Sequence, residues 1–253
     1  MIIYLLLFII GLVFGSFYLV VATRMPNEES LVLSRSHCDN CKHVLKWYEL
    51  IPLVSYIIQK GKCRKCGSKI SILAPFTEIL TAICFCIPYF LYGFGYLYFT
   101  LVVLFSLMII IYVSDFKFFI INDSPLFISI LIILCLKFYY FGLKSCGLAL
   151  LSGAIMFIVF MMVKLFGDKV FKKESLGGGD IKLAILIGVV LGVKLGLVAF
   201  ILSAFIALPY AVMVSFKNKE GIVPYGPFLI SSLIIVFIYM EQFKNMLYYL
   251  FNI

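Results

Sequence analysis

Two groups of residues in this sequence have types and spacings that could support chemistry. The first is a pair of CxxC motifs, Cys38–Cys41 and Cys63–Cys66, with 21 residues between them. Four thiolates at such a spacing can surround Zn²⁺ as a tetrahedron, and a closed site of this kind is structural rather than catalytic. A disulfide or redox pair, and a loop without metal, are the alternatives that the spacing leaves open.

The second group consists of carboxylates at the edges of apolar runs. Asp115 ends one such run, Asp123 begins the next, and Asp180 follows Gly177-Gly178-Gly179 and opens a third. Glu78 lies near the start of another run. Carboxylates near hydrocarbon are costly, so each of them is a candidate functional residue.

Asp115 and Asp180 are both expected at the same end of their helices, where they could meet. Two carboxyls held close share a proton, because both cannot ionise easily. The ionised group can then activate water while the protonated group polarises a peptide carbonyl, which is the chemistry of an aspartic protease. A helix cap at Asp180 and an ordinary interface residue at Asp115 are the plain alternatives. A glycine-rich loop can also bind phosphate, but the segment GGGDIKL lacks the Gly-Lys-Ser/Thr of a phosphate-binding loop, so the sequence argues against that function.

The elements that must position these residues are membrane helices. Of the 253 residues, 64% are hydrophobic and only 13% are charged, which excludes a soluble enzyme, a disordered chain and a secreted disulfide scaffold. We therefore expect an all-α polytopic membrane protein with about eight transmembrane helices. The apolar runs fall at about 2–21, 72–92, 95–113, 125–141, 145–166, 181–193, 195–214 and 225–240. The run 181–193 is short for a full crossing, so we expect it to be tilted, buried in protein or joined closely to the next helix.

Basic residues predict the orientation of these helices. The loops at 22–74, 114–124, 164–182 and 217–220 fall on one face and carry 17 of the 21 basic residues. The other face keeps only Lys137, Lys144, Lys194 and Lys244. This bias predicts that the first face is cytoplasmic, and it explains the net charge of +9 without a nucleic-acid partner.

The chain is expected to have three parts. Residues 1–23 form a first transmembrane helix that is retained rather than cleaved as a signal peptide. Residues 24–74 form a small cytoplasmic loop domain held by zinc, since a core of that size needs such support. Residues 75–253 form a membrane domain of about seven helices.

Six ordered motifs resemble those of the type IV prepilin peptidases, which are bifunctional leader peptidases and N-methyltransferases. These are Gly11-Leu-Val-Phe-Gly-Ser-Phe17 with Arg24-Met25-Pro26, the cysteine loop with KWYELIP, Pro75-Phe-Thr-Glu78, SDFKFFIIND, GGGDIKL, and Val223-Pro-Tyr-Gly-Pro-Phe228. The resemblance covers nearly the whole chain.

The resemblance implies a GxGD-type membrane aspartic protease that cleaves the leader peptides of prepilins or pseudopilins at the cytoplasmic face of a bacterial plasma membrane. It implies that Asp115 and Asp180 are the catalytic pair and that the four loop cysteines bind zinc. It also implies supporting roles, which fall on Gly177, Gly179, Asp123 and Glu78. S-adenosylmethionine would be the methyl donor, and the loop domain would be linked to methylation.

The sequence departs from the family pattern at several positions, none of which is Asp115 or Asp180. These are Tyr18-Leu19, Glu49-Leu50, Leu73-Ala74 and Asn122. Because several lie in the N-terminal half, a peptidase without methyltransferase activity remains the alternative. A transporter or scaffold with a zinc-bound loop is the alternative from another class, since intramembrane acids also serve proton relays.

Overall fold

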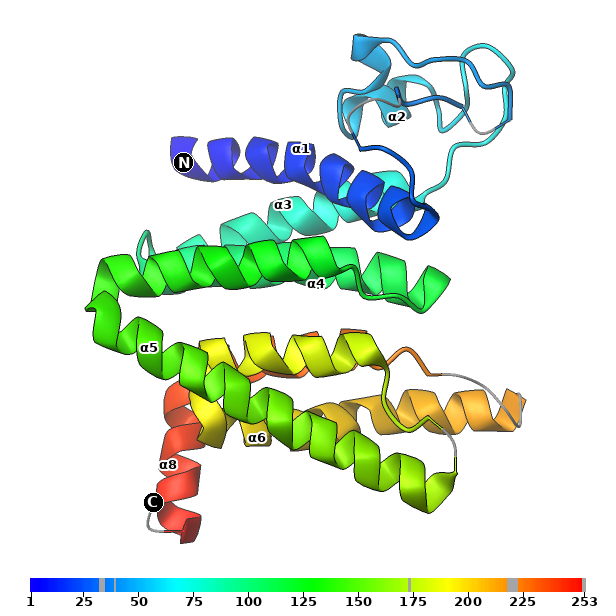
Figure 1. Cartoon of the computed structure of the whole chain (residues 1–253). Helices are drawn as coiled ribbons and strands as arrows, with labels where there is room; N and C mark the ends of the chain where they lie inside the picture. The colour runs from blue at the N-terminus through cyan, green and yellow to red at the C-terminus, as the bar shows by residue number, and fades with distance from the viewer. Residues whose placement is uncertain (32–34, 39, 173, 218–222, 252–253) are drawn as a thin grey trace. The chain divides into compact units, whose positions relative to one another are not determined.

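A computed structural model describes residues 1–31, 35–38, 40–172, 174–217 and 223–251, and most of these residues form helices (Figure 1). Within these residues the only β-structure is two isolated bridges, so the predicted all-helical fold is confirmed. The longer helices are α1 (Ile2–Arg24), α3 (Leu73–Tyr92), α4 (Tyr96–Phe118), α5 (Asp123–Phe171), α6 (Gly178–Lys217), α7 (Gly226–Ile238) and α8 (Met240–Phe251). Short helices η1 (Met25–Asn27), η2 (Trp47–Glu49) and α2 (Val54–Ile58) lie between α1 and α3.

The apolar helices match the predicted membrane runs. Five described helices are long and apolar enough to cross a membrane, and the bent pair α7–α8 makes a sixth candidate. Both α5 and α6 contain a glycine with φ of 77°, Gly142 and Gly192, at which the helix breaks into two segments. Splitting both helices at these breaks yields the eight apolar segments that the sequence predicts.

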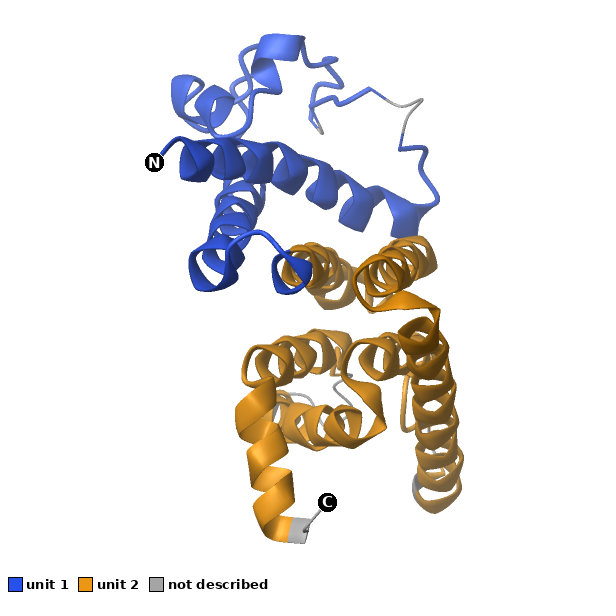
Figure 2. Ribbon diagram, turned by 90° about the vertical axis from the view of Figure 1, so that its left-hand side faces the viewer, with its two compact units in different colours: residues 1–98 blue, residues 99–253 orange. Residues whose placement is uncertain are grey.

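The chain divides into two compact units, residues 1–98 and 99–253 (Figure 2). In the first unit α1 packs closely on α3 through Gly11 and Gly15. A Cβ atom at Gly11 would lie 2.5 Å from the Ala82 Cα, and one at Gly15 would lie 2.6 Å from the Glu78 Cα. This GxxxG spacing lets two membrane helices touch through their backbones.

The second unit has its core around the first half of α6. Leu183, Ala184, Leu186, Ile187 and Val189 are fully buried. The short run at 181–193 is therefore enclosed by protein, and it joins the next helical segment directly at Gly192. Helix α8 meets α7 at 84° and crosses the direction of α6 (Figure 1).

Candidate active site

Asp115 lies in the last turn of α4. The N–H of Phe119, a residue with φ of 56°, donates to the Asp115 carbonyl at 2.9 Å, and the helix ends at the preceding residue, Phe118. The side chain of Asp115 is buried, and its Oδ2 accepts a hydrogen bond of 3.1 Å from the N–H of Gly226. A Cβ atom at Gly226 would lie 2.9 Å from that oxygen, so glycine permits this approach.

The segment before α7 fixes the donor that reaches Asp115. The Tyr225 and Ser203 hydroxyls are 2.6 Å apart, which ties the start of α7 to α6. Gly226 then begins α7, and its N–H can donate to Asp115 because the first N–H groups of a helix have no partner within the helix. The closing motif Val223–Phe228 is thus explained by a contact to a residue more than 100 positions earlier.

Asp180 lies in the first turn of α6, which begins at Gly178. Its N–H donates to the Gly177 carbonyl at 3.2 Å, and its side chain is buried. Its Oδ1 has no hydrogen-bond partner among the described residues. Because α6 begins at Gly178, Asp180 is the third residue of the helix and does not occupy the N-cap position.

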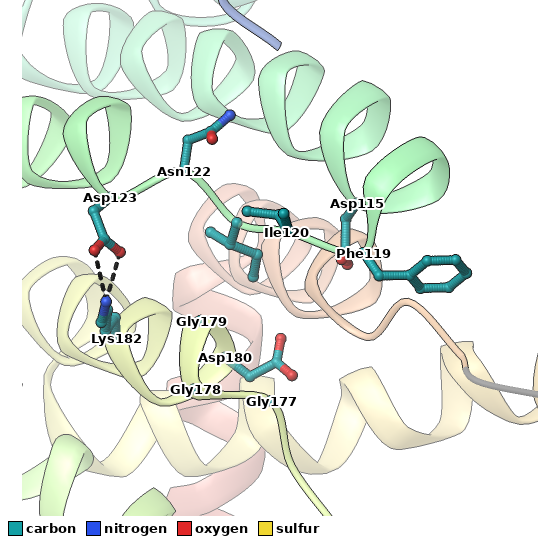
Figure 3. A pocket seen from close by; sticks show the side chains of 11 residues that line it. Asp115, Phe119, Ile120, Asn122, Asp123, Gly177, Gly178, Gly179, Asp180 and Lys182 are labelled. Atoms are coloured by element: carbon teal, nitrogen blue, oxygen red, sulfur yellow. Dashed lines mark hydrogen bonds and ion pairs between the residues drawn. The ribbon is translucent and has the colours of Figure 1, made fainter. Parts of the chain in front are cut away.

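The two aspartates line one cavity of about 410 Å³. Figure 3 shows their side chains reaching into it from facing elements, Asp115 from α4 and Asp180 from the start of α6. The other lining residues are Phe119, Ile120, Ile121, Asn122, Asp123, Gly177, Gly178, Gly179 and Lys182. Two carboxyls, exposed glycine backbone and apolar side chains together suit an extended peptide and a water molecule.

The glycines before Asp180 differ in what surrounds them. A Cβ atom at Gly179 would lie 2.8 Å from the Ile121 Cβ, whereas one at Gly178 would meet nothing within 4 Å. At Gly177 the nearest atom would be the Asp180 Oδ2, at 3.1 Å. Gly179 is therefore required by packing against the α4–α5 connection, and Gly177 leaves room for the Asp180 carboxyl.

Asp123 and Glu78, the two acids with predicted supporting roles, lie in different units of the chain. Asp123 begins α5 and forms an ion pair of 2.7 Å with Lys182, which joins α5 to the second turn of α6 at the rim of the cavity. Glu78 lies in the other unit, where its Oε2 accepts a hydrogen bond of 2.7 Å from the Leu53 N–H. Glu78 is not among the lining residues of this cavity.

Sequence reasoning missed several contacts around the cavity. Lys182 lies two residues after Asp180 in the motif GGGDIKL, but the motif does not indicate that Asp123 is the partner of Lys182. Gly226 also lies inside a recognised motif, and its role depends on a contact that only the fold creates. The GxxxG spacing of Gly11 and Gly15 was a signal available in the sequence.

The four predicted metal ligands come together in the first unit. The sulfur atoms of Cys38, Cys41, Cys63 and Cys66 all lie within 4.8 Å of one another. The Cys38–Cys66 and Cys41–Cys63 sulfur distances are 3.8 and 3.9 Å. A tetrahedral Zn²⁺ with bonds of about 2.3 Å separates its sulfurs by about 3.8 Å, whereas a disulfide needs about 2.05 Å. The residues therefore fit a metal ion.

Each CxxC pair lies in the same kind of turn. The Cys38 N–H donates to the His43 carbonyl and the Cys63 N–H to the Ser68 carbonyl, at 2.9 and 2.8 Å. Although the His43 N–H lowers it, burial and the neighbouring thiols together raise the pKa of the Cys41 thiol to about 11. The backbone N–H of Cys41, the Ser68 hydroxyl and the N–H of Asn40 lower the pKa of the Cys38 thiol to about 6. Thiolates stabilised in this way are the form that binds metal.

Comparisons with known proteins give matches along most of the chain. Residues 9–92 match the family model described as the bacterial peptidase A24 N-terminal domain, and residues 102–212 match the type IV leader peptidase family. The chain is 35% identical to the prepilin leader peptidase/N-methyltransferase of Bacillus subtilis, over 94% of both chains. It is 32% identical to the protein of the same name from Vibrio cholerae, over 93% of this chain and 96% of that one. No solved structure gives a significant match.

Proposed function

Because the chain belongs to the type IV leader peptidase family, we propose that Asp115 and Asp180 are its catalytic pair and that their cavity is its active site. The protein is an enzyme with prepilin leader peptidase and N-methyltransferase activity, as its named relatives are. The observation that carries the assignment of the pair is that two buried carboxyls, 65 positions apart in the chain, line one cavity.

The pair acts by sharing one proton. The ionised carboxyl takes a proton from water, and the resulting hydroxide attacks the carbonyl carbon of the scissile peptide while the protonated carboxyl donates to the carbonyl oxygen. The C–N bond then breaks as the leaving nitrogen takes the proton that the first carboxyl removed from water. Because water is the nucleophile, no covalent enzyme intermediate forms. The Gly226 N–H donates to Asp115 Oδ2. Asp180 Oδ1 has no partner among the described residues, which supports its assignment as the oxygen that carries or accepts the shared proton.

The substrate is a prepilin or pseudopilin whose apolar helix lies against the spans. Phe119, Ile120 and Ile121 offer apolar contacts beside the two aspartates. The backbone of Gly177–Gly179 leaves space for an extended chain to approach Asp180. The leader would remain on the cytoplasmic side of a bacterial plasma membrane, since the distribution of basic residues in the sequence predicts that this end of the helices is cytoplasmic.

The four cysteines would hold a structural zinc ion, which would cross-link the loop domain and leave no open position for water. S-adenosylmethionine, when bound, would supply the methyl group for the new N-terminus, as the N-methyltransferase name of the relatives suggests. In functional terms residues 1–23 are the first span, residues 24–74 are the zinc loop linked to methyl transfer, and residues 75–253 are the peptidase domain.

A single assay tests these assignments. The purified chain, a candidate prepilin and S-adenosylmethionine are incubated in lipid nanodiscs, and the products are weighed by mass spectrometry. We expect loss of the leader and a mass gain of one methyl group on the product. Asp115→Asn should leave the prepilin intact, whereas Glu241→Gln, which removes an exposed charge on α8, should cleave it normally. Cleavage by the Asp115→Asn variant would overturn the catalytic assignment.

A further inference from the structure

The segment between η2 and the end of α2, residues 47–58, exposes an unusual number of large apolar side chains. We call it the interfacial segment. Trp47 is 77% exposed, Ile57 64% and Ile58 63%. Leu50, Ile51 and Val54 are exposed as well. A soluble domain scatters such residues singly, and a concentrated group of them indicates an interaction surface.

Helix α2 turns its apolar face outward. Val54, Ile57 and Ile58 occupy positions i, i+3 and i+4 of one helical turn, so they share a face, and all three are exposed. Ser55 and Tyr56 on the other side are less exposed. This is the reverse of the pattern of a helix on a water-soluble domain, where the apolar face packs inward.

A hydrogen bond fixes the interfacial segment to the start of a membrane helix. The Leu53 N–H donates to Glu78 Oε2 at 2.7 Å, and Glu78 is buried in the second turn of α3. At 1.5 Å per residue, Glu78 lies about 8 Å along the axis from Leu73, where α3 begins. The segment is therefore held at the depth where a spanning α3 would enter the bilayer.

The charges around the interfacial segment are of one sign. Between Asn40 and Ile72 the chain has seven basic residues and one acid, Glu49. Glu49 is buried, accepts the Lys46 N–H at 2.9 Å and lies 3.5 Å from the His43 ring. The exposed charges next to the apolar side chains are therefore positive, which complements an anionic lipid surface.

We propose that residues 47–58 are an interfacial anchor that lies in the headgroup region of an anionic bilayer, on the leaflet where α3 begins. Trp47 and the Val54–Ile57–Ile58 face enter the boundary between headgroups and acyl chains, and Lys46, Lys60 and Lys62 contact lipid phosphates. The anchor holds the four-cysteine loop against the membrane. None of the residues 47–58 lines the cavity, so a test of the anchor does not depend on the peptidase assignment.

The chain offers a direct probe, because Trp47 is its only tryptophan. The full chain is reconstituted in vesicles of phosphatidylglycerol and phosphatidylcholine whose acyl chains carry bromine near the ester end. An interfacial side chain lies about 5–10 Å into the headgroup and acyl boundary, so these bromines should quench more than about half of the emission. Acrylamide in the water should quench it weakly.

Two other results would each overturn the proposal. Strong quenching by acrylamide with none by bromine would place Trp47 in water. Insensitivity to both quenchers would place Trp47 against protein, either another part of this chain or a second copy. Vesicles without phosphatidylglycerol should show weaker bromine quenching, and unchanged quenching would remove the role of the lysines.

Matched variants locate the anchor. Ile57→Ser with Ile58→Ser should reduce bromine quenching of Trp47 at least about twofold, because they remove apolar area from the same anchor. Val44→Ser, an exposed apolar residue on the first cysteine turn, should leave it unchanged. Equal effects from both variants would contradict a specific role for residues 47–58.

Discussion

Single glycines decide how closely the neighbouring chain approaches Asp180. Gly178 and Gly179 are adjacent and have the same residue type, but only a side chain at Gly179 would meet Ile121, at 2.8 Å. Overpacking of this kind costs about 1–3 kcal/mol or displaces the neighbour. A side chain added at Gly179 therefore tests the packing beside Asp180.

Gly179→Ala should lower the rate of prepilin cleavage roughly 10- to 100-fold, since a displacement on the order of 1 Å at a reacting centre has that effect. Gly147→Ala on α5, outside the cavity, should keep the rate within about threefold, because its Cβ would meet open space. The measurement is kcat/KM of both variants with one prepilin. Equal losses would show that the Gly179–Ile121 contact does not position the site.

The cysteines give a second prediction for individual residues. Cys63→Ser should abolish stoichiometric zinc, measured by elemental mass spectrometry of the purified chain, because three thiolates leave the tetrahedron incomplete. Cys84→Ser, which changes a buried cysteine of α3 outside the cluster, should retain the metal. A wild-type chain purified without any bound metal under reducing conditions would contradict the proposed site.

At the scale of helices, α5 and α6 depend on small residues where they cross. A Cβ atom at Gly188 would collide with the backbone around Ser152 and Gly153, so the two helices touch through their main chains there. This contact holds the buried first half of α6, and hence Asp180, against the rest of the second unit.

Gly188→Leu should destabilise the second unit by about 3 kcal/mol or more, since neither backbone can move away without opening the core. Gly147→Leu on α5 should have little effect, because nothing lies within 4 Å of the added atom. Thermal unfolding in detergent compares the two variants. A melting temperature for Gly188→Leu equal to that of the wild type would refute this account of the helix contact.

The sequence anticipated the helices better than their contacts. Apolar runs of membrane length predicted the segments, and glycines marked the breaks at Gly142 and Gly192, because both features are local. Asp115 and Asp180 could be placed at one end of the bundle by counting crossings. The Gly226 N–H on Asp115 and the Lys182 pair with Asp123 could not be predicted, since they join residues 111 and 59 positions apart.

At the scale of the whole molecule, the distribution of basic residues predicts which side of the membrane holds the site. Alkaline phosphatase folds only outside the cytoplasm, where its disulfides form. A fusion after Ser71 in the basic loop should therefore be inactive, and one after Lys144 should be active. The opposite pattern of activities would invert the proposed orientation and place the cavity outside.

The central claim is that Asp115 and Asp180 act as one unit, and a double-mutant comparison tests it most directly. Cleavage rates of one prepilin are measured for Asp115→Asn, Asp180→Asn and the double variant. Catalytic groups that act as a unit are strongly non-additive, so each single variant should lose at least about 10³-fold and the double variant should be no worse. Substantial activity in either single variant, or losses that multiply in the double variant, would contradict the shared role of the two carboxyls.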